Sequence, residues 1–295
     1  MNESGIWLTL SSTKGRVGFG ILLALVAIAL VSPYVVPSPE KAYGQYLPPS
    51  AKHLLGTDYF GYNVLSWVLI GSRVSLLVGF LAGAAITAIA LAMAVIAGYF
   101  EKTILGELFS AIINVFLVIP ALPLLIVIAS YIVTQSVYPV IFAIVIISWP
   151  YPARILRSQI LTLKNREFVL ADKGLGLSDF QIIRSDILPS LYSIIFSVFL
   201  FGTIGAILTQ ASLQFLGLGG VSIVSWGSML YWAQNEEALF SGAWWWFLPP
   251  GIMIGLVGVA LVLINLSLDE VVNPRLQALK LSKKAKEIQK TFAAS

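Results

Sequence analysis

Residues 74–100 read VSLLVGFLAGAAITAIALAMAVIAGYF and contain no Asp, Glu, Lys, Arg or His. A helix of about 20 apolar residues crosses the roughly 30 Å of hydrocarbon in a lipid bilayer. We therefore predict that this segment is a membrane-spanning helix. The rest of the chain fits a membrane protein, because 58% of its residues are hydrophobic and only 11% are charged. In a typical soluble domain, about a quarter of the residues are charged.

Six apolar segments of this kind predict an all-α polytopic membrane protein with about six transmembrane helices. A charged segment precedes the first of them, but no cleavage site for a signal peptide follows, so we expect this helix to be retained. Pro120 and Pro123 are expected to kink the third helix, and Gln135 and Ser136 to form a tight turn between the third and fourth. The predicted helices span residues 17–36, 74–100, 108–134, 137–154, 191–216 and 248–268.

The positive charges predict the orientation of these helices, since Lys and Arg are enriched in cytoplasmic loops. With the N-terminus inside, fifteen Lys and Arg lie on the inner side and three lie outside. Both termini are then cytoplasmic. The predicted regions are a cytoplasmic N-terminal segment at 1–16, a transmembrane domain at 17–276 and a basic cytoplasmic tail at 277–295. Residues 37–73 and 217–247 form external loops, and 154–189 form a cytoplasmic loop.

Several kinds of chemistry are excluded by the composition. The chain has no cysteine and a single histidine, His53, so we predict no metal site. It has no phosphate-binding loop of the GxxxxGK(S/T) type, so it cannot hold ATP by itself. No constellation typical of an intramembrane enzyme is visible. A secondary transporter usually buries a charge within its helices, whereas the candidate path residues here are uncharged: Asn114, Thr209, Gln210 and Gln214. Contacts between helices are an alternative role for Asn114 and Gln210.

The loop at 154–189 predicts two short helices separated by glycines. Asn165 is expected to cap the first helix, which ends at Gly174 and Gly176. Ser178 and Gln181 have the spacing of a capping box for the second helix. Phe180, Ile182, Ile183 and Ile187 are expected to form one apolar stripe, and Leu188-Pro189 to end the helix. The physical pattern leaves two interpretations open: packing on the chain's own helices, or docking into a groove of a partner.

The segment EFVLADKGLG at 167–176, followed by ILP at 187–189, resembles the EAA loop of ATP-binding-cassette importer permeases. Asp172 departs from this pattern, because the family has alanine there. The resemblance implies that the loop contacts partner ATPases. The residues implied in this contact are Glu167, Ala171, Asp172, Gly174, Gly176, Ser178, Asp179, Leu188 and Pro189.

Further segments resemble the C-type permeases of dipeptide and oligopeptide importers, in the same order along the chain. They are HLLGTD at 53–58, GSRVSLLVG at 71–79, QASLQFLGLG at 210–219, SWGSML at 225–230, WFLPPG at 246–251 and LDEVVNPR at 268–275. The external part of this pattern includes Gly56, Thr57, Asp58 and Trp226. Departures occur at Tyr62-Asn63, at Gln210 and at Asn265-Leu266, and they put in doubt any salt bridge that the family builds there.

The resemblance implies the fold of a type I ABC importer permease with a coupling helix in the cytoplasmic loop. It implies that the chain lies in the plasma membrane of a prokaryote and has four partners. These are a homologous B-type permease, two cytoplasmic ABC ATPases that bind ATP and Mg²⁺, and an extracytoplasmic substrate-binding protein. This chain would bind no cofactor and no nucleic acid. Peptides are the expected cargo; oligosaccharides or nickel are alternatives within the same architecture, and a stand-alone secondary transporter or channel is the rival class. The external tryptophans are expected to form a belt at the membrane surface.

Overall fold

The computed structural model describes residues 12–36, 42–131 and 136–272. Every secondary-structure element in this part of the chain is a helix, apart from one isolated β-bridge between Thr57 and Asn63. Four of these helices are long and apolar enough to cross a membrane, and the number rises to six if each of two bent helix pairs counts as one span. The all-α fold with about six spans is therefore confirmed. The basic tail, the turn at Gln135 and most of the N-terminal segment lie outside the described residues.

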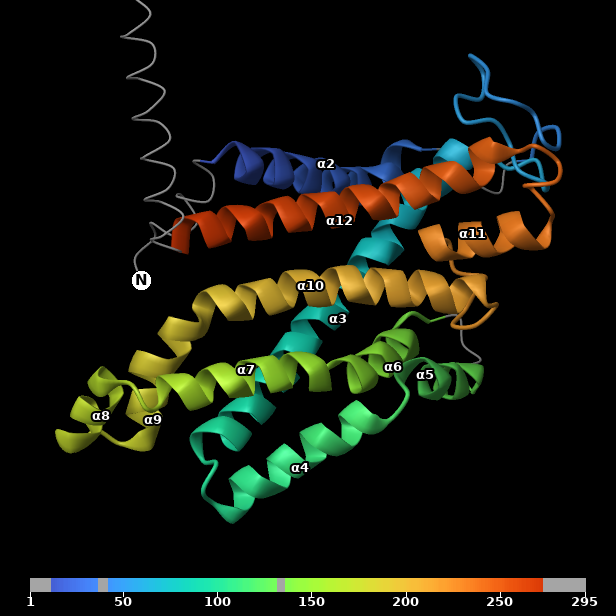
Figure 1. Ribbon diagram of the computed structural model, residues 1–295. Helices are drawn as coiled ribbons and strands as arrows, with labels where there is room; N and C mark the ends of the chain where they lie inside the picture. Colours follow the sequence, from blue (N-terminus) through green and yellow to red (C-terminus); the bar gives the residue numbers. More distant parts are fainter. Residues whose placement is uncertain (1–11, 37–41, 132–135, 273–295) are drawn as a thin grey trace, which may run out of the picture.

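Helices α2 (Thr13–Val35) and α12 (Trp244–Val272) form an antiparallel pair on one side of the molecule (Figure 1). Ser12 begins α2 by accepting a hydrogen bond from the Gly15 N–H. At the same end of the pair, Lys14 Nζ lies 2.6 Å from a carboxylate oxygen of Glu270. The prolines near the start of α12 do not break it, and this helix begins four residues earlier than the predicted 248–268.

Helix α3 (Val64–Tyr99) crosses the molecule diagonally and packs against α2, α4, α6, α7, α10, α11 and α12. Its start was predicted ten residues too late. Asn63 caps the helix by accepting hydrogen bonds from the N–H groups of Leu65 and Ser66. Val64 and Val68 are buried in the first two turns, so tertiary packing extends α3 beyond the purely apolar segment. Arg73 is therefore a helical residue and not part of an external loop.

The third and fourth predicted helices are each divided in two. Helices α4 (Ile104–Val118) and α5 (Ala121–Ser130) meet at an angle of 82°, which is a break and not the expected kink. Ile119 has an extended backbone because it precedes Pro120. Helices α6 (Tyr138–Ser148) and α7 (Pro150–Leu163) are bent by 44° at Trp149. Since α7 continues to Leu163, the predicted loop at 154–189 begins inside a helix.

Helices α8 (Glu167–Gly174) and α9 (Asp179–Ile182) are the two short helices that the sequence predicts. However, Leu188-Pro189 does not end the second one. Helix α9 continues through a π-helical turn, η1 (Ile183–Ile187), into α10 (Leu188–Phe215). Pro189 has no N–H to donate to the hydrogen-bond ladder of this continuous helix, and the wider π turn directly before it accommodates the interruption. We call residues 167–187 the knuckle.

The external loop at 217–247 contains a helix that was not predicted, α11 (Trp226–Asn235). The Ser225 and Ser228 side chains form a capping box at its start. Trp226 and Trp246 are almost fully buried, so the expected tryptophan belt is wrong for these two residues. Trp244 is 54% exposed and is compatible with it.

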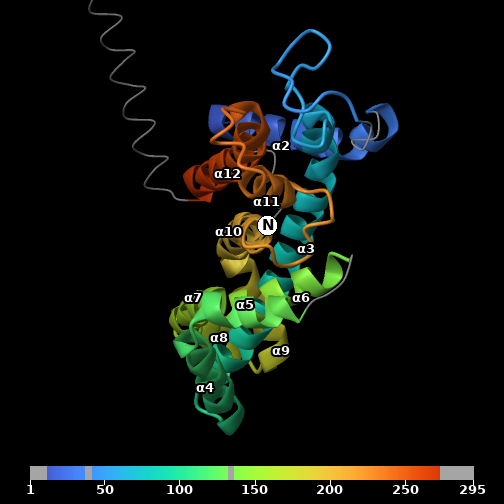
Figure 2. The ribbon, with the colours of Figure 1, turned by 90° about the vertical axis from the view of Figure 1, so that its right-hand side faces the viewer.

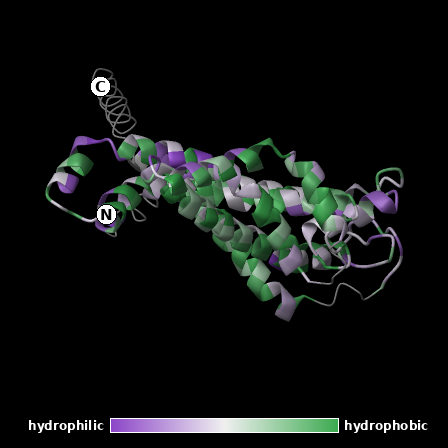
Figure 3. Ribbon diagram, turned by 90° about the horizontal axis from the view of Figure 1, so that it is seen from below, coloured by the Kyte–Doolittle hydropathy of each residue, from purple (hydrophilic) through white to green (hydrophobic). Residues whose placement is uncertain are grey.

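The helices run between two distinct ends of the molecule. Figures 1 and 2 show α2 and α12 on one side, α4 to α7 on the other, and α3 and α10 between them. The knuckle lies at one end, together with the start of α2 and the end of α12. The loop before α3 and helix α11 lie at the opposite end, which we call the loop end. Hydrophobic residues dominate the middle of the helices in Figure 3.

Candidate functional site

The knuckle is attached to the helices through one buried face. Val169, Ile182 and Ile187 are at most 2% exposed and pack in one cluster with residues of α3 and α7, including Ala97 and Ile160. A polar contact adds to this packing, since the Tyr99 hydroxyl at the end of α3 donates a 2.8 Å hydrogen bond to Asp179. The knuckle is therefore fixed to α3 and α7, and through η1 it is continuous with α10.

Local sequence explains the shape of the knuckle. Gly176 has a φ of +85°, a conformation that favours glycine, and it separates α8 from α9. Ser178 and Gln181 form the predicted capping box. Asn165 does not cap α8, because its side-chain amide instead donates to the Leu161 carbonyl at the end of α7.

The opposite face of the knuckle is exposed and apolar. Phe168, Leu175 and Phe180 are 47%, 78% and 72% exposed. The backbone at Gly174 and Gly176 is open, because a Cβ added at either would meet no atom within 4 Å. The predicted stripe is therefore wrong as a single surface: Phe180 faces outward, whereas Ile182 and Ile187 are buried. Glu167 and Ala171 are exposed on α8, and Pro189 is exposed at the start of α10.

Asp172, which replaces the alanine of the family pattern, lies close to Asp186 of η1. Partial desolvation and this second carboxylate raise the pKa of Asp172 above its usual value. One carboxylate oxygen of Asp186 is buried and has no hydrogen-bond partner among the described residues. The departure from the family pattern thus places two acidic groups side by side where the knuckle meets α10.

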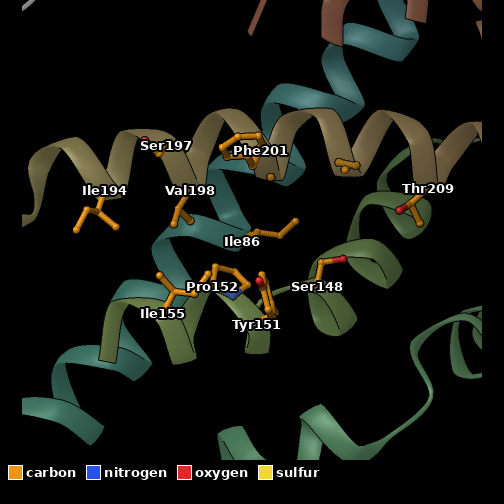
Figure 4. A pocket seen from close by; sticks show the side chains of 13 residues that line it. Ile86, Ser148, Tyr151, Pro152, Ile155, Ile194, Ser197, Val198, Phe201 and Thr209 are labelled. Atoms are coloured by element: carbon orange, nitrogen blue, oxygen red, sulfur yellow. The ribbon is translucent and has the colours of Figure 1, made fainter. Parts of the chain in front are cut away.

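A cavity of about 630 Å³ lies between α3, α6, α7 and α10. Figure 4 shows side chains of α7 and α10 on its two sides, with Ile86 of α3 between them. None of the lining residues is charged: Ile86, Ser148, Tyr151, Pro152, Ile155, Ile194, Ser197, Val198, Phe201, Gly202, Gly205, Ala206 and Thr209. The cavity thus offers an apolar wall with a few hydroxyl groups.

The four candidate path residues are not brought together. Thr209 lines the cavity. Gln210 is 3% exposed and its side-chain oxygen has no hydrogen-bond partner among the described residues. Gln214 is buried and accepts a 2.7 Å hydrogen bond from the Ser225 hydroxyl, so it holds the start of α11. Asn114 is a residue of α4 and lines a separate groove.

The residues of the external motif build the loop end. Thr57 is fully buried, donates to the Gly44 carbonyl and accepts from the Leu47 N–H. Gly56 has a φ of +65°, and a Cβ there would lie 2.4 Å from the Leu47 carbonyl oxygen. Asp58 is 1% exposed and accepts a 2.7 Å hydrogen bond from the Tyr62 N–H. Burial raises the pKa of Asp58 to about 7, against the opposing effect of backbone hydrogen bonds.

Trp226, the fourth residue of the external motif, ties α11 to α3. Its backbone N–H donates to the Ser75 hydroxyl and its indole N–H donates to the Val68 carbonyl, at 3.1 Å and 3.0 Å. The side chain is fully buried. Together with the contacts of Thr57 and Asp58, these bonds give the external motif a clear structural role.

Sequence reasoning missed three residues that the structure places at these sites. Tyr151 and Phe201 line the cavity from α7 and α10, and Tyr99 holds the knuckle. Tyr151 follows a tryptophan and a proline at a helix bend, which is a weak signal for a functional position. Phe201 lies in an apolar segment where one aromatic residue cannot be distinguished from the next. Tyr99 ends such a segment and gives no signal of its own.

A bundle of apolar helices, with an exposed knuckle at one end and a cavity along its inner helices, defines a membrane subunit of a transport system. The chain belongs to the family of binding-protein-dependent transport system inner membrane components, whose model matches residues 86–278. It is therefore the permease subunit of an ABC importer.

Similar proteins are found along most of the chain. The dipeptide transport system permease protein DppC of Bacillus subtilis is 32% identical over 92% of this chain and 85% of its own length. The di/tripeptide transport system permease protein DppC of Pseudomonas aeruginosa is 31% identical over 92% of this chain and 91% of its own length. Among solved structures, a chain of the MetNI methionine ABC transporter in inward-facing conformations has a TM-score of 0.55. It is 19% identical, and the match covers 69% of this chain and 97% of that one.

Proposed function

We propose that this permease imports dipeptides and short oligopeptides, together with a second, homologous permease, two ATPases and an external binding protein. The observation that supports this most directly is the match to peptide permeases over about nine-tenths of the chain. The uncharged cavity is compatible with such cargo, because a wall without fixed charge does not select peptide side chains by the sign of their charge. Specificity would then reside mainly in the binding protein.

The knuckle is the proposed contact with an ATPase, on the cytoplasmic side of the membrane. Its exposed apolar residues fit a groove on a soluble partner, and its buried face is fixed to three long helices. When the ATPases close on ATP, a displacement of the knuckle would tilt α3, α7 and α10 together as a nearly rigid body.

Reconstitution tests this function. The tagged chain is purified with its co-purifying subunits, placed in liposomes with the binding protein, and assayed for uptake of labelled dipeptides. We expect uptake to require ATP and Mg²⁺ on the ATPase side and to persist when ion gradients are collapsed. Unlabelled dipeptides should compete, whereas oligosaccharides and Ni²⁺ should not. Transport by the chain alone along an ion gradient would show that the importer assignment is wrong.

The cavity between α7 and α10 is the proposed half of the translocation path. It is the described cavity in which Thr209, a predicted path residue, meets two aromatic residues and two glycines. The other half would come from the homologous permease. This proposal replaces Asn114, Gln210 and Gln214 as path residues, because none of them lines this cavity.

Gly205→Phe tests the path. A Cβ at Gly205 meets no atom within 4 Å and Gly205 lines the cavity, so the larger side chain extends into the cavity from an open position. We expect normal assembly with the ATPases and a strong decrease in the initial rate of peptide uptake. Gly251→Phe on α12 is the matched control, since Gly251 is equally open and does not line the cavity. Equal uptake by wild type and Gly205→Phe would place the path elsewhere.

A further inference from the structure

A second, polar groove lies at the knuckle end of the bundle, between α4, α7 and the turn after α3. Its volume is about 580 Å³, and four of its seven lining residues are charged: Glu101, Lys102, Glu107 and Arg157. Asn114, Ser110 and Ala111 complete the lining. A charged groove beside apolar helices lies where a membrane-spanning helix leaves the hydrocarbon and meets the lipid headgroups.

The groove does not face the proposed path. Arg157 follows Ile155 of the cavity wall by two residues, and positions two apart on a helix differ by about 200°. Arg157 therefore projects from the side of α7 opposite the cavity. Its Nε donates to the Ala97 carbonyl at 3.3 Å, which fixes the guanidinium at the groove. One face of α7 thus lines the cavity, and the opposite face lines the charged groove.

The charges in the groove are only partly neutralised by one another, because Lys164, Arg157 and Lys102 all lower the pKa of Glu101. Lys164 forms an ion pair with Glu101. Among the described residues, no carboxylate oxygen lies within 4.0 Å of Lys102 or Arg157, and Glu107 has no cationic partner within that distance. Two cations and one carboxylate without a direct ion pair among the described residues therefore line this groove, beside the Glu101–Lys164 pair. An anchored arginine with free terminal nitrogens has the geometry to bind two oxygens of a phosphate.

An apolar surface continues from the groove along α4. Glu107, Ala111, Asn114 and Val118 follow one another at intervals of three or four residues and share one face of the helix. Val118 at the far end is 83% exposed. The neighbouring Leu108 and Val115 are also exposed, at 51% and 60%. A ligand with a charged head in the groove would place apolar chains along this face.

We propose that this groove binds the headgroup of a phospholipid that carries both a phosphate and a primary ammonium, such as phosphatidylethanolamine. Arg157 and Lys102 hold the phosphate. Glu107 accepts hydrogen bonds from the ammonium, and Asn114 lies about two helical turns further along α4, toward the acyl chains. The match between two cations, one anion and an apolar strip distinguishes this ligand from a purely anionic lipid. Asn114, a candidate path residue from the sequence, is thereby assigned to lipid binding.

Native mass spectrometry of the full-length chain in detergent tests this site. Phosphatidylethanolamine, phosphatidylglycerol and phosphatidylcholine with identical acyl chains are added in turn. We expect tighter binding of phosphatidylethanolamine, because the glycerol headgroup has no ammonium and the choline ammonium has no N–H. Lys102→Ala and Arg157→Gln should each weaken its binding by about tenfold. Glu107→Gln should remove the preference over the other two lipids.

Controls separate the site from general effects. Arg73→Gln removes an exposed positive charge near the loop end and should leave lipid binding unchanged. Lys102 is exposed, so Lys102→Ala tests the site even if Arg157→Gln fails to fold. Inorganic phosphate and phosphoethanolamine should not displace the lipid, since they lack acyl chains. Equal binding of the three lipids, displacement by phosphoethanolamine, or wild-type binding by Lys102→Ala would each overturn the proposal.

Discussion

Phe180→Asp is expected to leave the chain folded and inserted, but to abolish its stable association with the ATPases. Phe180 is 72% exposed on the knuckle, so a polar replacement removes little packing within the chain. If the side chain is an anchor in an ATPase groove, its loss decreases affinity by about 30-fold or more, as for other central aromatic residues of interfaces. ATP-driven peptide uptake should decrease in parallel.

The measurement is co-purification of ATPases with the tagged chain, followed by uptake in liposomes. Phe240→Asp is a matched control, because Phe240 is an aromatic residue of 88% exposure beyond α11, at the loop end. Its variant should retain the ATPases in full. Ile182→Asp gives the contrasting result, because Ile182 is fully buried and its replacement should destabilise the knuckle itself. Wild-type co-purification by Phe180→Asp would exclude this face as the docking surface.

Gly83→Val is expected to prevent correct packing of the bundle. A Cβ at Gly83 would lie 2.4 Å from the Thr203 hydroxyl oxygen and 2.8 Å from its backbone nitrogen. The hydroxyl can rotate away, but the backbone of α10 can move only if the whole helix shifts. Overpacking of this kind typically costs 1–3 kcal/mol and occasionally more; we expect about 3 kcal/mol or more here, because the clash is with main-chain atoms.

Thermal unfolding in detergent, with the monodisperse fraction as a second readout, measures this effect. Gly251→Val is the control: a Cβ at Gly251 meets nothing within 4 Å, so this variant should unfold like wild type. Combining Gly83→Ala with Thr203→Ala should recover only part of the stability lost in Gly83→Ala, since the contact with the Thr203 backbone remains. Unchanged unfolding of Gly83→Val would mean that α3 and α10 are not in close contact at this point.

The two predictions also show where sequence reasoning reached its limit. Both small-residue pairs, Gly79 with Gly83 and Gly251 with Gly255, have the spacing that favours close helix contact. Only the first pair is packed against another helix, since its added Cβ atoms would meet Ile207 and Thr203 of α10. The spacing alone does not distinguish the two pairs, because the partner helix supplies the difference.

The knuckle was predicted better than the helix packing, because its features have local causes. A left-handed conformation at Gly176 and the capping box of Ser178 depend on residues within one turn. The error concerned direction: Phe180 and Ile182 were placed on one stripe, but only Ile182 faces the cluster on α3 and α7. A helix of four residues such as α9 is too short for apolar periodicity to specify which of its faces is buried.

The sequence by itself determined that this is a helical membrane protein, where its apolar segments lie, and which short motifs join it to its family. These properties follow from composition, from the length of apolar segments and from turns with local causes. Only the tertiary structure decided the start of α3, the break between α4 and α5, helix α11, and which residues line the cavity and the charged groove. Within a membrane-spanning segment, side chains that face lipid and side chains that face protein are both apolar. The amphipathic pattern that locates the buried face of a soluble helix is therefore absent, and contacts between helices supply that information.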